Sequence, residues 1–345
     1  MSRRDQSDTH NIFSPDGRRP DNGISRREFL KGVLASSAGI AAASALSLGE
    51  AAEETNKPRV VIARNPKVIS GQKVDGKVAE EILEKAMCSL TGKSSSTDAW
   101  RSLFSPSEKV IVKVNALFPP VTPSPEFVRA ITNGLRDAGL KENNIIVHDR
   151  RNEELQRAGF TINESSKGVR FHGTREYSDW MQAAAGMLRT QLCKLITDEV
   201  DAIINVPSLK VHHRSGVTLS LKNLLGCISN AGETHGDGCP RIVDISALNP
   251  IRKKTRLIVV DGVRAQFDQG PGYSAPHVWN YGGLLVATDT VAADAVGANE
   301  ILAKRKAMGI EGPIRPSLVH VERAAELGLG IAALDKIEVL RLPSR

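Results

Sequence analysis

The sequence has few aromatic residues and no concentrated block of positive charge. Phe, Trp and Tyr make up 4% of its 345 residues, and the net charge of +7 is spread along the chain without a long Lys/Arg run. Proteins that bind nucleic acids usually offer aromatic rings for stacking and a clustered basic surface. The composition therefore argues against nucleic-acid binding, and the modest basic excess favours a small anionic ligand.

Several cofactor motifs are also absent. The four cysteines form no C-x-x-C pair, which excludes the usual spacings of iron–sulfur clusters and zinc ribbons. Neither G-x-G-x-x-G nor G-x-x-x-x-G-K-[ST] occurs, so no common dinucleotide site or P-loop is indicated. Cys227 and Cys239 flank His235 in a Gly-rich stretch, which leaves both a local disulfide and a divalent-metal site containing His235 open.

The N-terminal region has the pattern of an export signal. Ser25-Arg26-Arg27 is followed by Phe29-Leu30 and by an apolar, Ala-rich run without charge between Lys31 and Glu50. A basic segment before a hydrophobic segment is typical of signal peptides, and the paired arginines look like a twin-arginine signal. The alternative is a membrane anchor, but the run is short and weakly apolar for a membrane span.

These observations divide the chain into three parts. Residues 1–24 are expected to form a disordered polar leader and residues 25–50 the twin-arginine signal segment. Residues 55–345 are expected to form the folded domain, with 55–200 and 201–345 as an alternative division into two lobes. The expected partner of the signal is the twin-arginine translocation machinery. The expected location is periplasmic or otherwise extracytoplasmic, with membrane contact only through the signal.

The remaining sequence alternates apolar strands with amphipathic helices. This order predicts an α/β fold with a mainly parallel sheet, helices on both faces and Gly/Pro-rich loops over the carboxyl ends of the strands. The stretch Ser124-Pro125-Glu126 predicts the start of a helix. The predicted strands are 59–63, 108–115, 144–149, 200–208, 256–263, 282–289 and 336–342, and the main predicted helices are 76–92, 124–140, 152–160, 290–305 and 317–327.

Polar residues follow several of these strands, where α/β sheets bind their ligands. Asn115, His148, Asn205, Asp261 and Asp289 each stand at or just after a strand end. We expect Asn115, Asn205 and Asp261 to contact the ligand and His148 to act in catalysis. Asp-Gly at 261–262 also fits an ordinary turn, and Asp289 fits a helix cap better.

The stretch from Leu209 to Gly226 concentrates basic groups among leucines. We expect 209–217 to be a loop and 218–225 a helix capped by Thr218 or Ser215. The free N–H groups of that helix would then meet the basic side chains at an anion site. We expect His212 to act as a general acid/base near its ideal pKa, Lys210 and Lys222 as electrostatic clamps, and His213 and Asn223 as ligand-binding residues. Solvated loop charges are the alternative.

The same stretch carries a family resemblance. The segment "INVPSLKVHHRSGVTLSLKNLLG" resembles the domain-of-unknown-function family three-six-two, which shows Asn-x-Pro-x-x-Lys-x-His followed by Gly-x-Thr-Leu and Lys-Asn-Leu-x-Gly. "VIVKVN", "LIVVDGV" and "LLVATDTVAADAVGANEIL" support it over most of residues 110–342. Some members of the family carry a ferredoxin-like cysteine cluster, which this chain lacks.

A more remote resemblance links His212, Gly216 and Lys222 to the lactate racemase catalytic family. There a His-x3-Gly-x5-Lys stretch supplies a catalytic histidine and the lysine that tethers a nickel-pincer nucleotide. "VHDRRNEEL" around His148 is similar to a second catalytic segment, and His235 could stand for the nickel ligand. The phosphate-binding glycine pair is replaced by Leu219-Ser220-Leu221. The resemblance therefore implies a shared fold and site position rather than the nickel cofactor.

Two classes of function remain. The first is an exported enzyme that uses His and Lys acid–base chemistry on a small anionic substrate, with or without a metal or cofactor. The second is an exported protein that binds an anionic ligand or cofactor, or assembles with another exported complex, without chemistry of its own.

Overall fold

The computed structural model describes residues 57–176, 179–236 and 239–344. The predicted leader (1–24) and twin-arginine segment (25–50) lie outside these residues. Residues 56–345 form one compact unit, and strand pairing crosses the alternative lobe boundary at residue 200. In the described part of the chain, no helix combines the length and apolarity needed to cross a membrane.

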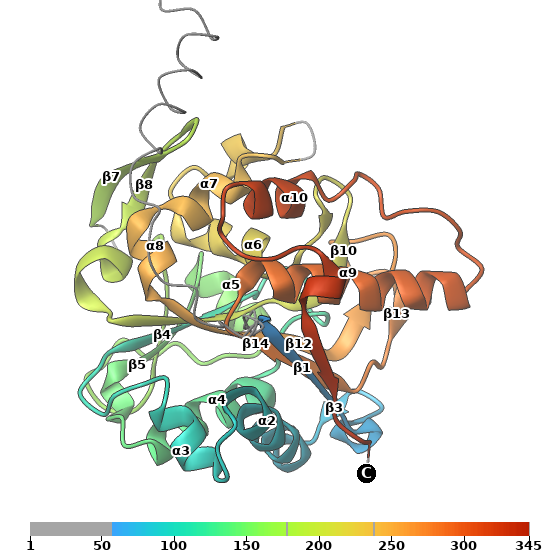
Figure 1. Ribbon diagram of the computed structural model, residues 1–345. Helices are drawn as coiled ribbons and strands as arrows, with labels where there is room; N and C mark the ends of the chain where they lie inside the picture. The colour runs from blue at the N-terminus through green and yellow to red at the C-terminus, as the bar shows by residue number, and fades with distance from the viewer. Residues whose placement is uncertain (1–56, 177–178, 237–238, 345) are drawn as a thin grey trace, which may run out of the picture. The chain divides into compact units, whose positions relative to one another are not determined.

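A mixed, mainly parallel sheet runs through the middle of this unit (Figure 1). Its strand order is β15-β1-β14-β12-β9-β4-β5-β6. Strand β14 is antiparallel to both neighbours, and the other neighbours on this path pair in parallel. The predicted α/β class and mainly parallel sheet are thus confirmed. The strands are β1 (Arg59–Arg64), β4 (Val110–Val114), β5 (Ile145–Asp149), β6 (Arg170–Gly173), β9 (Ala202–Val206), β12 (Thr255–Gln266), β14 (Gly283–Ala287) and β15 (Glu338–Arg341).

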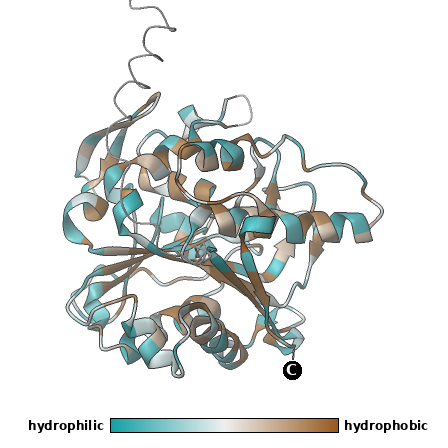
Figure 2. Ribbon diagram, viewed as in Figure 1, coloured by the Kyte–Doolittle hydropathy of each residue, from teal (hydrophilic) through white to brown (hydrophobic). Residues whose placement is uncertain are grey.

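Helices cover both faces of the sheet (Figure 1), as predicted. On one face lie α2 (Gly76–Thr91), α3 (Ser96–Arg101) and α4 (Pro125–Asp137). On the other lie α6 (Leu219–Asn223), α7 (Ile242–Ala247), α8 (Asn249–Lys254), α9 (Thr290–Ala307) and α10 (Val319–Glu326). The short helix α5 (Asn152–Arg157) follows β5. Figure 2 shows the strands between the two layers as mostly hydrophobic, as strands covered on both faces should be.

Local sequence signals explain where several elements begin. The Ser124 hydroxyl accepts a hydrogen bond from the Phe127 N–H, and Pro125 occupies the first turn of α4, as the Ser-Pro-Glu stretch predicts. Asp289 caps α9 by accepting from the N–H groups of Val291 and Ala292. Because β14 is antiparallel, Asp289 lies at the sheet edge opposite to the carboxyl ends of the parallel strands.

Side chains of β4 alternate between the two faces of the sheet. Val110, Val112 and Val114 belong to the hydrophobic cluster on the α2–α4 side, whereas Ile111 belongs to a cluster on the other side. Successive side chains of a strand point to opposite faces. Lys113 therefore shares the Ile111 face and reaches toward α6, where its Nζ contacts Asn223.

Two local predictions were wrong. Residues 209–217 form a hairpin rather than a loop, with β10 (Ser208–His212) paired to β11 (Gly216–Val217). Asp261-Gly262 is not a turn but lies inside β12, and β10 pairs in parallel with the later part of that strand. A Cβ at Gly262 would stand 2.7 Å from the Tyr281 ring, so this glycine serves close packing.

Shorter elements complete the described chain. Strands β7 (Trp180–Ala185) and β8 (Leu188–Cys193) form a separate hairpin, and β2 (Ile69–Ser70) and β3 (Lys73–Val74) form another. Strand β13 (Val278–Trp279) pairs with β12. Two 3-10 helices follow α6, namely η4 (Leu224–Cys227) and η5 (Ala231–Thr234).

The strand order identifies one preferred place for a ligand. From β4 the chain moves outward through β5 to β6, and it then returns to place β9 and β12 on the other side of β4. The boundary between β4 and β9 is therefore a topological switch point. Crevices at the carboxyl ends of strands beside such a point are the usual ligand sites of open α/β sheets.

Candidate functional site

A cavity of about 110 Å³ lies at this switch point. This volume is well below the roughly 300–1,000 Å³ of sites for drug-sized ligands, so only a small ligand fits. The carboxyl ends of β4 and β5, the β10 strand, helix α6 and the segments after it all contribute to the wall. The polar lining residues are Lys113, Asn115, Asp149, Arg150, Glu154, Lys210, His212, Thr218, Lys222, Asn223 and His235.

The floor of the cavity is a buried ion pair. Lys113 Nζ lies 2.7 Å from Asp149 Oδ1, and only about 1% of the lysine is exposed. Lys113 Nζ also donates to the Val114 carbonyl, and Asp149 Oδ2 accepts from the Ala116 N–H at 2.6 Å. Every charged atom of the pair therefore has a partner, which a buried ion pair requires.

Gly226 closes over this ion pair. A Cβ at this position would lie 2.4 Å from Lys113 Cε and 2.7 Å from Asp149 Oδ1. Any larger residue would displace one of the two charged side chains. The absence of a side chain at Gly226 thus allows the turn after α6 to cover the pair.

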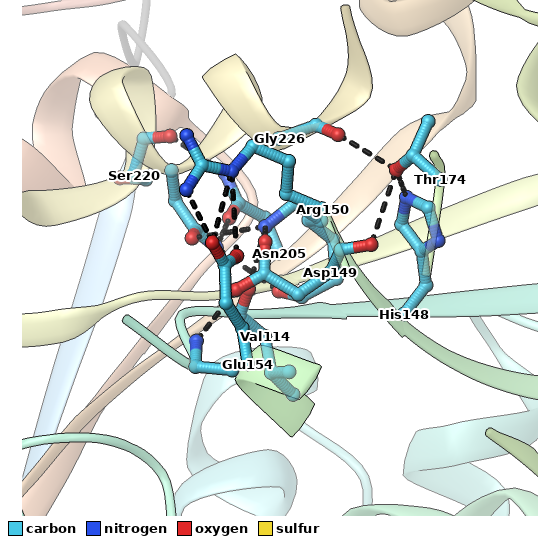
Figure 3. Close-up of polar contacts among 12 residues, drawn as sticks. Val114, His148, Asp149, Arg150, Glu154, Thr174, Asn205, Ser220 and Gly226 are labelled. Carbon is cyan, nitrogen blue, oxygen red and sulfur yellow. Dashed lines mark hydrogen bonds and ion pairs between the residues drawn. The ribbon is translucent and has the colours of Figure 1, made fainter. Parts of the chain in front are cut away.

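A second ion pair lies beside the first. Arg150, which is half-buried, binds the carboxylate of Glu154 one turn later in α5 (Figure 3). The hydrogen bond that Arg150 donates to Glu154 raises the pKa of Arg150, so the guanidinium remains charged. The two acidic side chains of the lining are therefore both matched by a cation.

Lys210 is buried without such a match. Its Nζ donates to the carbonyls of Leu117 and Val121 at 3.0 and 2.9 Å, and about 1% of the residue is exposed. Burial lowers the pKa of Lys210 to about 7, although Asp149 and Asp261 partly oppose this effect from a distance. Lys210 holds the 117–121 loop against the cavity and carries a proton that is easily lost near neutral pH.

Lys222 also has no carboxylate partner in the part of the chain that the structure describes. Its Nζ lies 2.8 Å from His235 Nε2, and burial lowers the pKa of Lys222 to about 8. His235 Nδ1 lies 2.9 Å from the Ala231 carbonyl, which can only accept. Nδ1 therefore carries the imidazole proton, and Nε2 accepts a hydrogen bond from Lys222.

His212 differs from the prediction. Burial, followed by the nearby Lys222, lowers the pKa of His212 to about 2. The imidazole of His212 is therefore neutral over the whole physiological pH range. The sequence instead suggested a general acid/base with a pKa near its ideal value. Its Nδ1 accepts from the Arg214 N–H at 3.1 Å, which places the ring proton on Nε2. His212 can still donate a hydrogen bond from Nε2.

Two buried polar atoms of the lining have no hydrogen-bond partner. These are Asn115 Oδ1 and Thr218 Oγ1. An unsatisfied buried polar group costs about 1–3 kcal/mol, so its presence needs an explanation. Since both residues line the same cavity, a polar ligand held there would supply the missing partners.

Asn205 and Asn223 stabilise the floor from behind. The Asn223 amide donates to the Lys113 carbonyl and to Asn205 Oδ1, and the Asn205 amide donates to the Ser220 carbonyl. Asn223 lines the cavity, whereas Asn205 does not. The structure thus gives Asn205 a positioning role rather than the predicted ligand contact.

The predicted anion site at the start of α6 is already filled. The carboxylate of Asp294, from α9, accepts hydrogen bonds from the Ser220 and Leu221 N–H groups at 2.6 and 3.0 Å. Thr218 occupies the cap position without a side-chain hydrogen bond, and the Ser215 hydroxyl donates to Val217. The helix end therefore binds an acidic residue of the protein itself, and the predicted caps were wrong.

Three predicted site residues besides Asn205 do not line the cavity. His148 is fully buried and contacts the Thr174 hydroxyl at 2.7 Å, which in turn donates to the Gly226 carbonyl (Figure 3). His213 is exposed and stacks on His212 with 5.0 Å between ring centroids. Asp261 lines a different cavity and accepts from the Val263 N–H.

Sequence reasoning missed four charged or polar members of the lining: Lys113, Asp149, Arg150 and Glu154. Lys113 was visible as the one charged residue in the apolar run "VIVKV". Asp149 and Arg150 directly follow the His148 candidate. Their pairing into two ion pairs depends on contacts between separate elements and has no local sequence signal.

Metal and disulfide expectations can also be compared with the structure. Within residues 57–176, 179–236 and 239–344, no group of three or more His, Cys, Asp and Glu residues could hold a metal ion. The Nε2 lone pair of His235 accepts a hydrogen bond from Lys222, and a metal role for this histidine stays a prediction. All four cysteines are free thiols.

Comparisons with known proteins agree with the predicted family. A search of curated proteins finds no match. A crystal structure of a Thermotoga maritima protein from the Northeast Structural Genomics Consortium matches with 12% identity and a TM-score of 0.36, covering 75% of this chain. This chain spans 60% of that structure, and a likeness at this level carries no argument. The family model described as "Domain of unknown function (DUF362)" matches residues 110–299. This match covers more than half of the chain, which therefore belongs to the DUF362 family.

Proposed function

We propose that this protein is an enzyme that binds a small anion, of carboxylate or phosphate type, in the switch-point cavity and moves a proton with a lysine. One observation carries the proposal. Lys210 and Lys222 bring two ammonium groups into one buried cavity, and neither has a carboxylate partner among residues 57–176, 179–236 and 239–344. A buried charge without a counter-charge is costly, and a bound anion would remove that cost.

The distribution of charge in the lining supports an anionic ligand. Asp149 and Glu154 are already paired with Lys113 and Arg150. A negatively charged ligand would therefore meet no unpaired carboxylate among the described lining residues. The unpartnered Thr218 hydroxyl and the Nε2–H of His212 offer donors to the same ligand, and Asn115 Oδ1 offers an acceptor.

The Lys222–His235 pair supports proton transfer. A group moves protons most effectively when its pKa lies near the working pH. Lys222, with a pKa of about 8, meets that condition, and His212 does not. Neutral Lys222 would take a proton from the bound substrate, while the Nε2–H of His212 and the Nζ hydrogens of Lys210 would donate to the negative charge that develops.

The first experiment measures anion binding. Phosphate, sulfate and small mono- and dicarboxylates are titrated into the full-length protein by calorimetry at pH 7. We expect at least one anion to bind, and Lys210→Met and Lys222→Met each to weaken it by ten-fold or more. Lys254→Met is the matched control, because Lys254 also donates to two backbone carbonyls but lies outside the cavity. Equal affinities in all four proteins would refute the site.

A second experiment separates an enzyme from a binding protein. The carboxylates that bind are incubated with the protein in D₂O, and loss of the C–H signal next to the carboxylate is followed by NMR. We expect wild type to exchange this proton and Lys222→Met to stop the exchange. Tight binding without exchange for every carboxylate would favour the alternative function, a binding protein that captures an anion without chemistry.

We also propose that residues 25–50 direct export by the twin-arginine route, which would make the translocation machinery a partner. The support is the sequence pattern around Arg26 and Arg27. Cell fractionation tests this point. We expect Arg26→Lys combined with Arg27→Lys to retain the protein in the cytoplasm, and normal export of this variant would contradict the assignment.

A further inference from the structure

Two buried cysteines lie opposite each other beside the site. Cys193 is the last residue of β8, and Cys227 is the last residue of η4. An isolated antiparallel bridge joins Leu192 to Ile228, and the Ser229 N–H donates to the Gln191 carbonyl at 3.0 Å. In antiparallel pairing the residue after one partner stands opposite the residue before the other. Cys193 therefore stands opposite Cys227.

This placement matches the geometry that a disulfide needs. Opposite residues of antiparallel chains have Cα atoms roughly 4.5–5.5 Å apart, within the range of roughly 4.4–6.8 Å that disulfides span. Both cysteines have 0% exposure and belong to the same apolar cluster. The Cys193 thiol is also one of the groups that act on the pKa of Cys227, which burial raises to about 12.

The other cysteines have different surroundings. Cys239 Sγ contacts the Arg214 carbonyl at 3.4 Å, and Cys88 lies in helix α2. The described strand pairs and bridges bring no other two cysteines opposite each other. The sequence spacing left open a disulfide between Cys227 and Cys239. The described strand pairs do not place these two cysteines opposite each other.

We propose that Cys193 and Cys227 are a disulfide-forming pair. The oxidant is a small disulfide such as oxidised glutathione. One thiolate attacks a sulfur of the oxidant and releases one glutathione thiolate; the second cysteine then displaces the other and completes the Cys193–Cys227 bond. Two electrons pass to the oxidant, which leaves as two thiols, and the protein loses two hydrogens.

The bond would act on the cavity through one residue. Gly226 precedes Cys227 and packs directly on the Lys113–Asp149 ion pair. A covalent bond from Cys227 to β8 would hold this turn over the pair and close a loop of 35 residues, counted from position 193 to position 227 with both included. The proposal does not depend on which anion the cavity binds.

Burial also determines how the bond must be made. The pKa of Cys193 is raised to about 11 and that of Cys227 to about 12, mainly because both thiols are buried. The reactive thiolate is therefore scarce in the folded chain. Oxidation should need a transient opening of the structure, which mild urea provides.

The test uses the folded full-length protein. It is incubated at pH 8 in mild urea with oxidised glutathione, and a parallel sample contains reduced dithiothreitol. Remaining thiols are then alkylated under denaturing conditions, and peptides are mapped by mass spectrometry. We expect one internal link, between Cys193 and Cys227, and a melting temperature about 5–10 °C above that of the reduced protein.

Variants make the assignment specific. Cys88→Ala and Cys239→Ala should keep the link, and Cys193→Ala or Cys227→Ala should abolish it. Four alkylated thiols in the oxidised wild-type protein, with circular dichroism showing a native fold, would overturn the proposal, as would a link between any other two cysteines. Because the wild-type peptide map is decisive by itself, a variant that fails to fold does not weaken the test.

Discussion

Replacing Lys210 with methionine should change how stability depends on pH. The folded protein holds the pKa of Lys210 at about 7, against 10.5 for an exposed lysine. At a pH between these two values, the unfolded chain therefore binds a proton at Lys210 that the folded chain has lost. The free energy of unfolding of wild type therefore rises with pH across this window.

The size of the effect follows from the same two values. A difference of about 3.5 pKa units corresponds to about 5 kcal/mol at about 1.36 kcal/mol per unit. About 3–4 kcal/mol of this should appear between pH 7 and pH 10, because titration in the unfolded chain is incomplete at pH 10. Lys210→Met abolishes this contribution but leaves the Leu117 and Val121 carbonyls without their donor, which adds a cost that does not depend on pH.

Urea unfolding at pH 7, 8, 9 and 10 measures the effect. The stability of wild type minus that of Lys210→Met should grow by about 3–4 kcal/mol over this range, whatever its value at pH 7. Contributions from Lys222 are common to both proteins and cancel in the difference. Lys254→Met, at a half-buried site outside the cavity, should give a much smaller change. A difference that stays constant from pH 7 to pH 10 would refute the burial of a proton-losing lysine at this position.

Three further predictions follow from the same contacts. Gly226→Ala should lower the free energy of unfolding by about 3 kcal/mol and weaken anion binding, because the added Cβ would displace the Lys113–Asp149 pair. Gly232→Ala is the control in the same urea titration and should have little effect, because its Cβ would have no atom within 4 Å. Asp294→Ala should lower the free energy of unfolding by about 2–4 kcal/mol, because it leaves the first N–H groups of α6 unpaired, and Asp294→Asn should lose less. Equal stabilities of wild type and Asp294→Ala would contradict the capping role. Anion affinity measured by calorimetry should fall as the pH rises through 7 and 8, because Lys210 and then Lys222 lose their protons in the free protein, and the fall should be less steep in Lys222→Met, where only Lys210 still titrates.

Local patterns were sufficient to predict most of the sheet and its helices. Strands β4, β5 and β9 are short apolar runs, and the Ser-Pro-Glu start of α4 is a cap with a known mechanism. The general rule that ligands bind at the carboxyl ends of parallel strands then brought Asn115, Lys210 and Lys222 to one cavity. These features depend on sequence neighbours or on the direction of the chain, which a sequence contains.

The errors concern contacts between distant parts of the chain. Asp294 fills the start of α6 from a helix about 70 residues later in the sequence, so the position looked free from local sequence alone. His212 was expected to titrate near neutrality, but its pKa depends on burial and on Lys222, which the fold brings close. Asp261 was placed in a turn, because the continuation of β12 is set by pairing with β10 and β13.

The cavity therefore differs from the rest of the interior in how its charges are arranged. The Lys113–Asp149 and Arg150–Glu154 pairs show that the fold can supply a carboxylate where it buries a cation. Lys210 and Lys222 receive only carbonyl oxygens and an imidazole, which leave positive charge in place and make the proton easy to lose. A protein selected for stability alone would gain by replacing such lysines with apolar residues. Retaining two of them around one small cavity supports the proposed anion site, because a bound ligand would bring the missing negative charge and recover their cost.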